Sequence, residues 1–230
     1  MTTEQIFTAV MTYLEKTTDE NRDFCLKAFE RGEHLPKETI EVCPLFAISN
    51  LALDLKEQLA VEAAKSAGKA KPRSAALRLI KSSVKSTANA SVHGAWLGKD
   101  GRQYMTNGAY IVALNTPLDL PTAEGAPNLE RVLTDPRRED LTEIPLPTVA
   151  ELKAFIKTEK ALGRKERKGE FYYDFGKNLP RVNSEFLLTI LEILPNAKAV
   201  YCPAMETRST LTFTSPDGEA LLMPCYKPHP

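Results

Sequence analysis

The residues in this chain whose types and spacing suggest a chemical role are basic, and the role that they suggest is the binding of phosphate groups. Between residues 65 and 85 every charged residue is basic. These residues are Lys65, Lys69, Lys71, Arg73, Arg78, Lys81 and Lys85. Three of them, Arg78, Lys81 and Lys85, recur at helical spacing. Lysine and arginine on one helix face can contact the phosphates of a nucleic acid without reading its bases.

A second basic stripe follows later in the chain, at spacings of four, three and four residues. It consists of Lys153, Lys157, Lys160 and Arg164, and it is accompanied by Glu151, Glu159 and Glu166. A solvated helix face with local ion pairs is the commoner origin of such a stripe. The segment from 65 to 85 is the stronger indication, because no acidic residue offsets it. The predicted nucleic-acid-binding residues are Lys69, Lys71, Arg73, Arg78, Lys81, Lys85, Lys153, Lys157, Lys160 and Arg164.

Groups that could support catalysis are sparse. The histidines are His34, His93 and His229, and the sequence has neither a Gly-x-Ser-x-Gly nor a His-Glu-x-x-His pattern. Cys25, Cys43, Cys202 and Cys225 are far apart, which indicates reduced thiols in an intracellular protein. We predict no catalytic residue, no metal ligand and no cofactor. A hydrolase or transferase is a further alternative, which would need His93 in a pocket beside a carboxylate or a cysteine.

One short segment is rich in aromatic residues. In an extended strand Phe171, Tyr173 and Phe175 share one face and Tyr172 takes the other. Such a row could stack the bases of a single-stranded nucleic acid. More often it belongs to a hydrophobic core, with the tyrosine hydroxyl reaching solvent. We favour the core.

Composition limits the class of protein. The 230 residues include 30 basic and 30 acidic side chains, so the formal net charge is zero. This argues against a histone-like binder of polyanions but permits a local basic face. The N-terminus lacks the pattern of a signal peptide, and no apolar run approaches the ~20 residues that a membrane helix needs. We expect a cytoplasmic protein without a membrane partner.

The basic residues must be positioned by helices. Residues 1–70 read as helical, with one helix capped at Thr3, one running from Asp19 to near Gly32 and one over 45–67. Residues 66–72 are a candidate linker. The next helix, over 74–86, has an apolar stripe of Leu77, Ile80 and Val84.

Strands follow this helix in two groups. Asp100-Gly101 and Asn107-Gly108 are tight-turn signals that divide residues 91–115 into a three-stranded meander. The prolines of 116–147 predict a surface excursion with little regular structure. A helix begins at a capping box of Thr148 and Glu151, with Val149, Leu152, Phe155, Ile156 and Leu162 on its apolar side. After the aromatic strand, a helix over 184–194 ends at Pro195, and a second meander closes the chain.

This layout resembles one domain of the DNA sliding clamp, in which a helix followed by a meander occurs twice. "PRVNSEFLLTILEIL" resembles the clamp segment in which a strand passes through an asparagine into an apolar helix. "LTFTSPDGEALLMPCYK" is similar to the closing hairpin of the clamp, whose last strand ends in Met-Pro before a basic residue. "DGRQYMTNGAYIVALN" looks like its early meander. The likeness covers residues 74–114 and 170–227, and mainly the second range. Bacterial clamps carry three such domains, whereas this chain has room for one.

The resemblance implies an α+β fold with a helical region over 1–70 and a clamp-like domain over 71–230. That domain would consist of two helix-plus-antiparallel-meander halves with an insertion at about 116–168. In clamps the helices line the DNA-facing surface, and the closing Met-Pro region borders a pocket for partner peptides. The resemblance therefore implies a partner site bordered by Leu222, Met223 and Pro224. The alternative, which we favour, is that these residues fill the core.

The function that the resemblance implies is that of a non-enzymatic, clamp-like accessory protein. Its partners would be duplex DNA, replication proteins or further copies of itself, because one domain cannot close a ring. The alternative is a protein-interaction or scaffolding module that does not bind DNA, since fold alone does not fix function.

Overall fold

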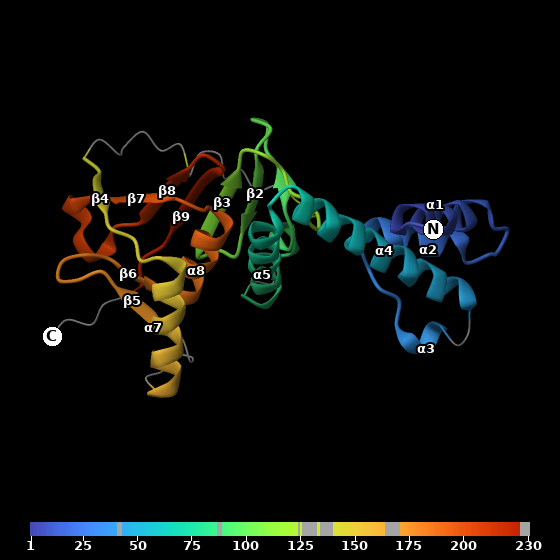
Figure 1. The fold of residues 1–230 in the computed structure, drawn as a ribbon, viewed down its shortest axis with the longest axis horizontal. Helices are drawn as coiled ribbons and strands as arrows, with labels where there is room; N and C mark the ends of the chain where they lie inside the picture. Colours follow the sequence, from blue (N-terminus) through green and yellow to red (C-terminus); the bar gives the residue numbers. More distant parts are fainter. Residues whose placement is uncertain are drawn as a thin grey trace. The chain divides into compact units, whose positions relative to one another are not determined.

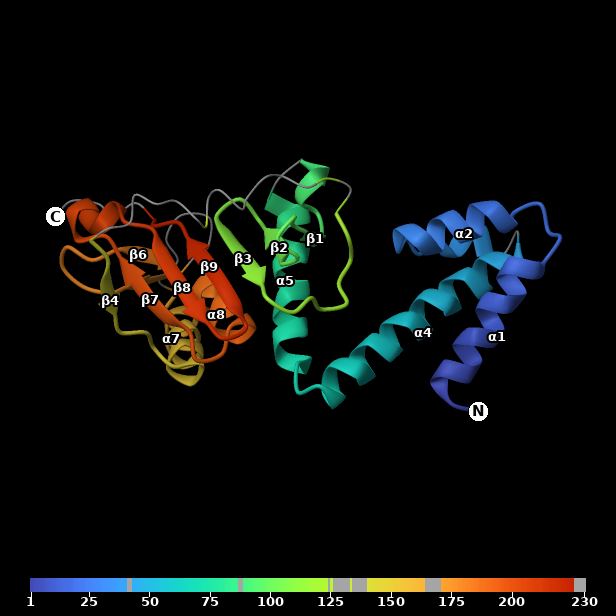
Figure 2. The same cartoon turned by 90° about the horizontal axis from the view of Figure 1, so that it is seen from above.

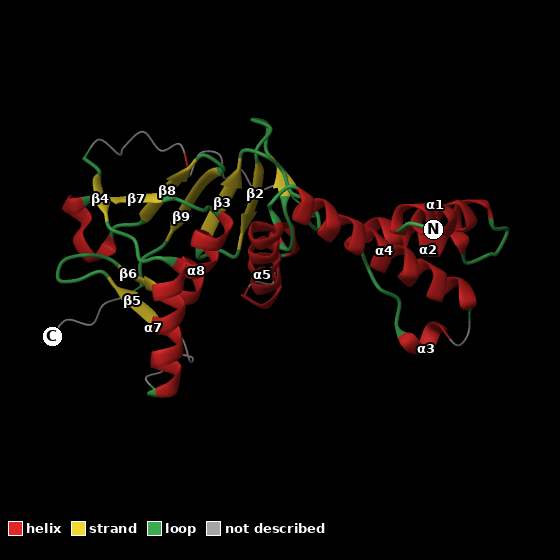
Figure 3. Cartoon of the chain, in the orientation of Figure 1, coloured by secondary structure: helices red, strands yellow, loops and turns green. Residues whose placement is uncertain are grey.

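Two compact units make up the chain, Met1–Ala70 and Lys71–Pro230. The computed structural model describes residues 1–40, 43–86, 89–123, 125, 133, 140–163 and 171–225. The boundary between the units coincides with the predicted one. Helices and antiparallel strands give a mixed α+β fold, as the sequence predicts (Figure 3).

The first unit is helical. It contains α1 (Thr3–Lys16), α2 (Arg22–Arg31), the short α3 (Lys37–Ile40) and the long α4 (Pro44–Ser66) (Figure 1). Its core consists of Leu14, Cys25, Ala28, Leu35, Cys43, Leu45 and Ala52. Helix α1 is capped by Thr2, one residue before the predicted cap, and Gln5 completes its capping box.

The predicted linker at 66–72 is mostly helical. Helix α4 ends at Ser66 and α5 spans Ala70–Ser86, so only residues 67–69 lie between them. Gly68 adopts a φ of +69°, and the Lys69 amide donates to the Ala64 carbonyl. Pro72 lies in the first turn of α5, where its missing N–H removes no intrahelical hydrogen bond. The proline therefore marks the start of a helix.

The second unit is built on a seven-stranded antiparallel sheet in the order β1-β2-β3-β9-β8-β7-β4 (Figure 2). Its strands are β1 (Trp96–Leu97), β2 (Gln103–Thr106), β3 (Tyr110–Leu114), β4 (Thr142–Ile144), β7 (Lys198–Tyr201), β8 (Leu211–Ser215) and β9 (Gly218–Leu222). In the described part of this unit, the 3-10 helices η1 (Ala90–Val92) and η3 (Pro203–Arg208) lie before β1 and after β7. A separate hairpin pairs β5 (Tyr172–Asp174) with β6 (Arg181–Asn183).

The sheet contains two helix-plus-meander halves that join along β3 and β9. Helix α5 precedes β1, β2 and β3, and α8 (Ser184–Ile193) precedes β7, β8 and β9. Thr106 pairs with Ile111 in the first hairpin, and Thr214 pairs with Glu219 in the second. Adding 108 to the number of a residue in the first hairpin therefore gives the residue at the same position in the second. The pair formed by Val112 and Ala220, between the two hairpins, has this same offset. The hydrogen-bonding registers therefore place an approximate twofold axis between β3 and β9.

Among the described helices, α5, α7 (Val149–Ala161) and α8 cover one face of this sheet (Figure 1). The core between the helices and the sheet includes Leu79, Ile80, Met105, Val112, Leu152, Ile156, Leu187, Ile190, Phe213 and Leu222. Helix α8 begins at Asn183, whose side chain accepts hydrogen bonds from the amides of Glu185 and Phe186. Its apolar residues are buried on most sides, as their distribution predicts.

The predicted insertion at 116–168 contributes to the core. The prediction of an irregular surface excursion over 116–147 is corrected at β4, and the helix predicted after Thr148 is α7. Strand β4 is the last strand of the sheet, next to β7, and its Ile144 is buried. Helix α7 adds Leu152 and Ile156 to the same core. An edge strand of three residues tolerates neighbouring prolines, because its outer N–H groups have no ladder partner to lose.

Candidate nucleic-acid interface

The exposed face of α5 carries four basic residues. Lys71, Arg78, Lys81 and Lys85 recur at spacings that place them on one side of the helix, and all four are exposed. The opposite side is buried against the core and consists largely of small residues, namely Ala75, Ala76, Leu79, Ile80 and Ser83. This arrangement presents a basic stripe to solvent.

Arg73 does not belong to that stripe, which corrects the prediction. It precedes Ala76 and Ile80 on the buried side of α5 and is only 5% exposed. Its Nε donates a hydrogen bond of 3.0 Å to the backbone carbonyl of Asp119. The predicted apolar stripe of Leu77, Ile80 and Val84 does not match the buried side of the helix, since Val84 is 55% exposed. The alanines and Ser83 decide which side is buried, because small residues let the helix approach its neighbours closely.

Two other predicted binding residues, Lys69 and Arg164, are not part of this stripe. Lys69 lies between α4 and α5, in the first unit, and is half-buried. Arg164 lies outside the residues that the structure describes.

The basic residues of α7 lie in the same helical layer as those of α5. Lys153, Lys157 and Lys160 are exposed, whereas Leu152 and Ile156 of this helix are buried. Glu192 of α8 connects the two stripes: Lys153 Nζ lies 2.6 Å from its Oε1, and Arg78 Nη2 contacts its Oε2. Glu192 has a side chain that is only 14% exposed. A single carboxylate therefore holds together basic residues from helices that are distant in sequence.

The helical layer is basic on balance. Helices α5, α7 and α8 contain eight lysines and arginines, including the buried Arg73, and four glutamates. Lys160 pairs with Glu185 at 3.0 Å and lies over the ring of Phe171. Within the described part of the chain, no carboxylate forms an ion pair with the lysines at 71, 81, 85 and 157. These side chains are available to an external anion.

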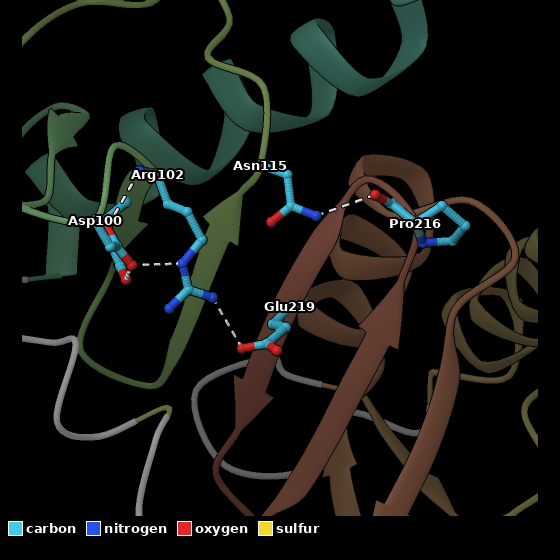
Figure 4. Close-up of polar contacts among 6 residues, drawn as sticks. Asp100, Arg102, Asn115, Pro216 and Glu219 are labelled. Atoms are coloured by element: carbon cyan, nitrogen blue, oxygen red, sulfur yellow. Dashed lines mark hydrogen bonds and ion pairs between the residues drawn. The ribbon is translucent and has the colours of Figure 1, made fainter.

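The opposite face of the sheet carries a structural ion cluster (Figure 4). Arg102 lies between Asp100, with its Nε 2.6 Å from Oδ2, and Glu219, with its Nη1 3.0 Å from Oε2. Tyr104 donates its hydroxyl to Asp100 at 2.7 Å. Desolvation raises the pKa of Asp100, but the hydrogen bonds from Tyr104 and Arg102 outweigh it and lower the pKa to about 2. This cluster ties the turn between β1 and β2 to β9.

The loop after β3 is fastened to the second hairpin in a similar way. The Asn115 amide group donates to the Pro216 carbonyl at 3.0 Å, and the Asn115 backbone N–H donates to Asp217. These contacts and the ion cluster join the two halves of the sheet, so we assign both to stability.

The aromatic row belongs to the core, as we favoured. Phe171 is 4% exposed, and Tyr173 packs edge-on against both Phe155 and Phe175, with ring centroids 5.3 and 5.0 Å away. Tyr172, on the other face of the strand, lies under the Arg181 guanidinium.

The predicted partner site at the end of β9 is wrong for Leu222, and the core alternative is right. Leu222 is fully buried on the same face of the strand as Ala220. Met223 is 49% exposed, and Pro224 is half-buried. Leu221 is also buried, but on the opposite face, where it packs with Trp96 and Tyr104.

The structure adds little to the catalytic alternative. His93 is half-buried just after η1. Among the described residues, no three histidine, cysteine, aspartate or glutamate side chains gather where they could hold a metal ion. The described helices also include none that combines the length and apolar character of a membrane span.

Sequence reasoning missed Glu192, the residue that organises the basic layer. The sequence does contain a signal for this residue, because Glu192 is one of only two charged residues in the largely apolar α8. A carboxylate on such a helix predicts a basic partner from a neighbouring element.

Comparison with known proteins identifies no relative: no protein-family model matches the chain, and no curated protein or solved structure is significantly similar to it. The resemblance to the sliding clamp stays a prediction. The functional argument therefore depends on the geometry of the helical layer.

Proposed function

We propose that the helical layer of residues 71–230 binds the phosphate backbone of duplex DNA, and that the protein is a clamp-like accessory factor without catalytic activity. The observation that carries the proposal is the convergence of Arg78 from α5 and Lys153 from α7 on Glu192. It assembles two basic stripes into one surface on the helical side of the sheet.

The chemistry of this surface suits contact with phosphates and not with bases. Long lysine side chains neutralise phosphates and release condensed counterions, so the affinity should fall steeply as salt increases. Arg78 and Lys153 are held in place but partly neutralised by Glu192. We therefore expect binding that is independent of DNA sequence and strongly dependent on ionic strength.

The first test measures the affinity for a labelled DNA duplex as a function of salt concentration. Replacing Lys81, Lys85 and Lys157 by alanine should weaken binding and reduce the slope of log K against log salt by about 0.9 for each phosphate that the variant no longer neutralises. The matched control is Lys198→Ala. Lys198 is exposed on β7 and precedes the buried Ala199, so it lies on the face of the sheet away from the helices. This variant should bind as the parent protein does.

The second test changes the affinity in the opposite direction. Glu192→Gln removes the negative charge between the two stripes and frees Arg78 and Lys153 for phosphates. It should raise the affinity at low salt and steepen the salt dependence, provided that circular dichroism shows an unchanged fold.

No binding at low salt, or binding that Glu192→Gln and the triple lysine variant leave unchanged, would contradict the proposal. The scaffolding alternative would then stand. It predicts partners that remain bound when an extract is treated with nuclease.

A further inference from the structure

Two cysteines that are distant in sequence come together in the core of the first unit. Cys25 lies in the first turns of α2, and Cys43 is the residue immediately before α4. The Asn21 side-chain amide contacts Cys43 Sγ at 3.6 Å, and Asn21 lies one helical turn before Cys25. Ser49 of α4 donates its hydroxyl to the Cys25 carbonyl at 3.1 Å. The start of α4 therefore packs along the face of α2 that carries Cys25.

A ring contact and the common core support the same packing. Phe24 and Phe46 lie with their ring centroids 5.7 Å apart, one residue from Cys25 and three from Cys43. Both cysteines belong to one hydrophobic cluster. Both are free thiols in this structure.

The two thiols differ in their environments. Cys25 is fully buried, and burial, with smaller contributions from Cys43 and Asp19, raises its pKa to about 11. Cys43 is 7% exposed and is the N-cap of the 23-residue helix α4. Cys43 is thus the thiol that an oxidant reaches first, and Cys25 is its neighbour.

We propose that Cys25 and Cys43 form a redox-sensitive dithiol that hydrogen peroxide converts into a disulfide. The Cys43 sulfur gives up its thiol proton and attacks one peroxide oxygen, the O–O bond breaks, and the departing hydroxide takes up that proton to leave as water. The resulting sulfenic acid reacts with the Cys25 thiol. An S–S bond forms, the S–O bond breaks, and the second oxygen leaves as water with the thiol proton. Peroxide is small enough to reach a thiol of such low exposure.

The disulfide would fasten α2 to the start of α4. It closes the segment between residues 25 and 43, which restricts the unfolded chain and stabilises the folded helical unit. The oxidised first unit should therefore melt at a higher temperature than the reduced one, and a dithiol reductant should reverse the change.

The experiment uses the full chain with Cys202→Ser and Cys225→Ser, so that only the two core cysteines remain. Hydrogen peroxide should remove both free thiols from the folded monomer with the loss of two hydrogen atoms. Tryptic digestion should then give residues 23–27 joined to residues 38–56. The matched controls carry Cys25→Ser or Cys43→Ser in the same background and should give no cross-linked peptide.

Three results would overturn the inference. These are two thiols that survive peroxide in the folded protein, a disulfide that forms only in denaturant, and oxidation of Cys43 to a sulfinic acid without a cross-link. Formation of the cross-link with a reversible rise in melting temperature would support it.

Discussion

Arg73 and Lys81 carry the same charge on one helix but have different roles. Arg73 is buried and hydrogen-bonded to the Asp119 carbonyl, whereas Lys81 extends into solvent. A buried guanidinium without its partner leaves costly unsatisfied donors, while an exposed lysine has water as an alternative partner. The basic composition of residues 65–85 therefore serves both packing and the proposed binding surface.

Asp100 gives a pH dependence whose sign follows from its contacts. Its folded pKa, about 2, lies below the ordinary value of about 3.9. A lowered carboxyl pKa contributes stability above the unfolded value and loses it as the pH falls through the folded value. We expect Asp100→Asn to be less stable than the parent near neutral pH. The difference should shrink between about pH 4 and about pH 2.

Urea unfolding of both proteins across this range measures the effect. A difference between the two proteins that stays constant as the pH falls would contradict the assignment of the shift to Tyr104 and Arg102.

The two hairpins are the elements that define the second unit. Their equivalent registers place β3 beside β9, and the close contact between these strands depends on Gly218. A Cβ at Gly218 would collide with the backbone carbonyl of Ala113 on the facing strand. Gly218 also has a backbone φ of +156°, a conformation that residues with a side chain rarely adopt.

Gly218→Ala should therefore disturb the pairing of the two halves and lower the free energy of unfolding by about 3 kcal/mol or more. The control is Gly101→Ala, whose φ is +77° but whose Cβ would meet open space. It should cost only about 1 kcal/mol, the penalty of the left-handed conformation. The free energies of unfolding are measured by chemical denaturation. If Gly218→Ala and Gly101→Ala lower them equally, the close contact with Ala113 does not determine how β3 and β9 pair.

The whole molecule consists of two units with separate cores. The first unit has its core around Leu14 and Cys25, and the second has its core between the helical layer and the sheet. Each unit therefore satisfies the main condition for independent folding. The proposed DNA surface lies within the second unit alone, apart from the predicted contribution of Lys69.

A fragment of residues 69–230 should accordingly fold by itself, with α5 complete from Ala70. We expect cooperative thermal unfolding of this fragment and a salt dependence of DNA binding close to that of the full chain. Calorimetry of the full chain should show one transition that matches the fragment. A fragment that is unfolded by circular dichroism would show that the second unit needs the first.

Several features of the fold could be predicted from local sequence. The capping box of Thr148 and Glu151 begins α7, and Asn183 and Pro195 bracket α8. Turn glycines at 101 and 108 separate the strands of the first meander, and both adopt a positive φ. For the candidate site, the spacing of Arg78, Lys81 and Lys85 predicted a shared face. Lys71 joins this face because α5 begins at Ala70, inside the predicted linker, and Arg73 is buried although it was predicted to bind nucleic acid.

The sequence by itself determined most of the helices and the strands of the two meanders, because caps, turns and periodicity act through hydrogen bonds between residues a few positions apart. Only the tertiary structure decided which side of α5 is buried, that β4 extends the sheet, and that Leu222 faces the core. It also brought Arg78 and Lys153 to Glu192. Burial and ion pairing depend on atoms supplied by distant segments, and those atoms meet only when the helices pack on the sheet.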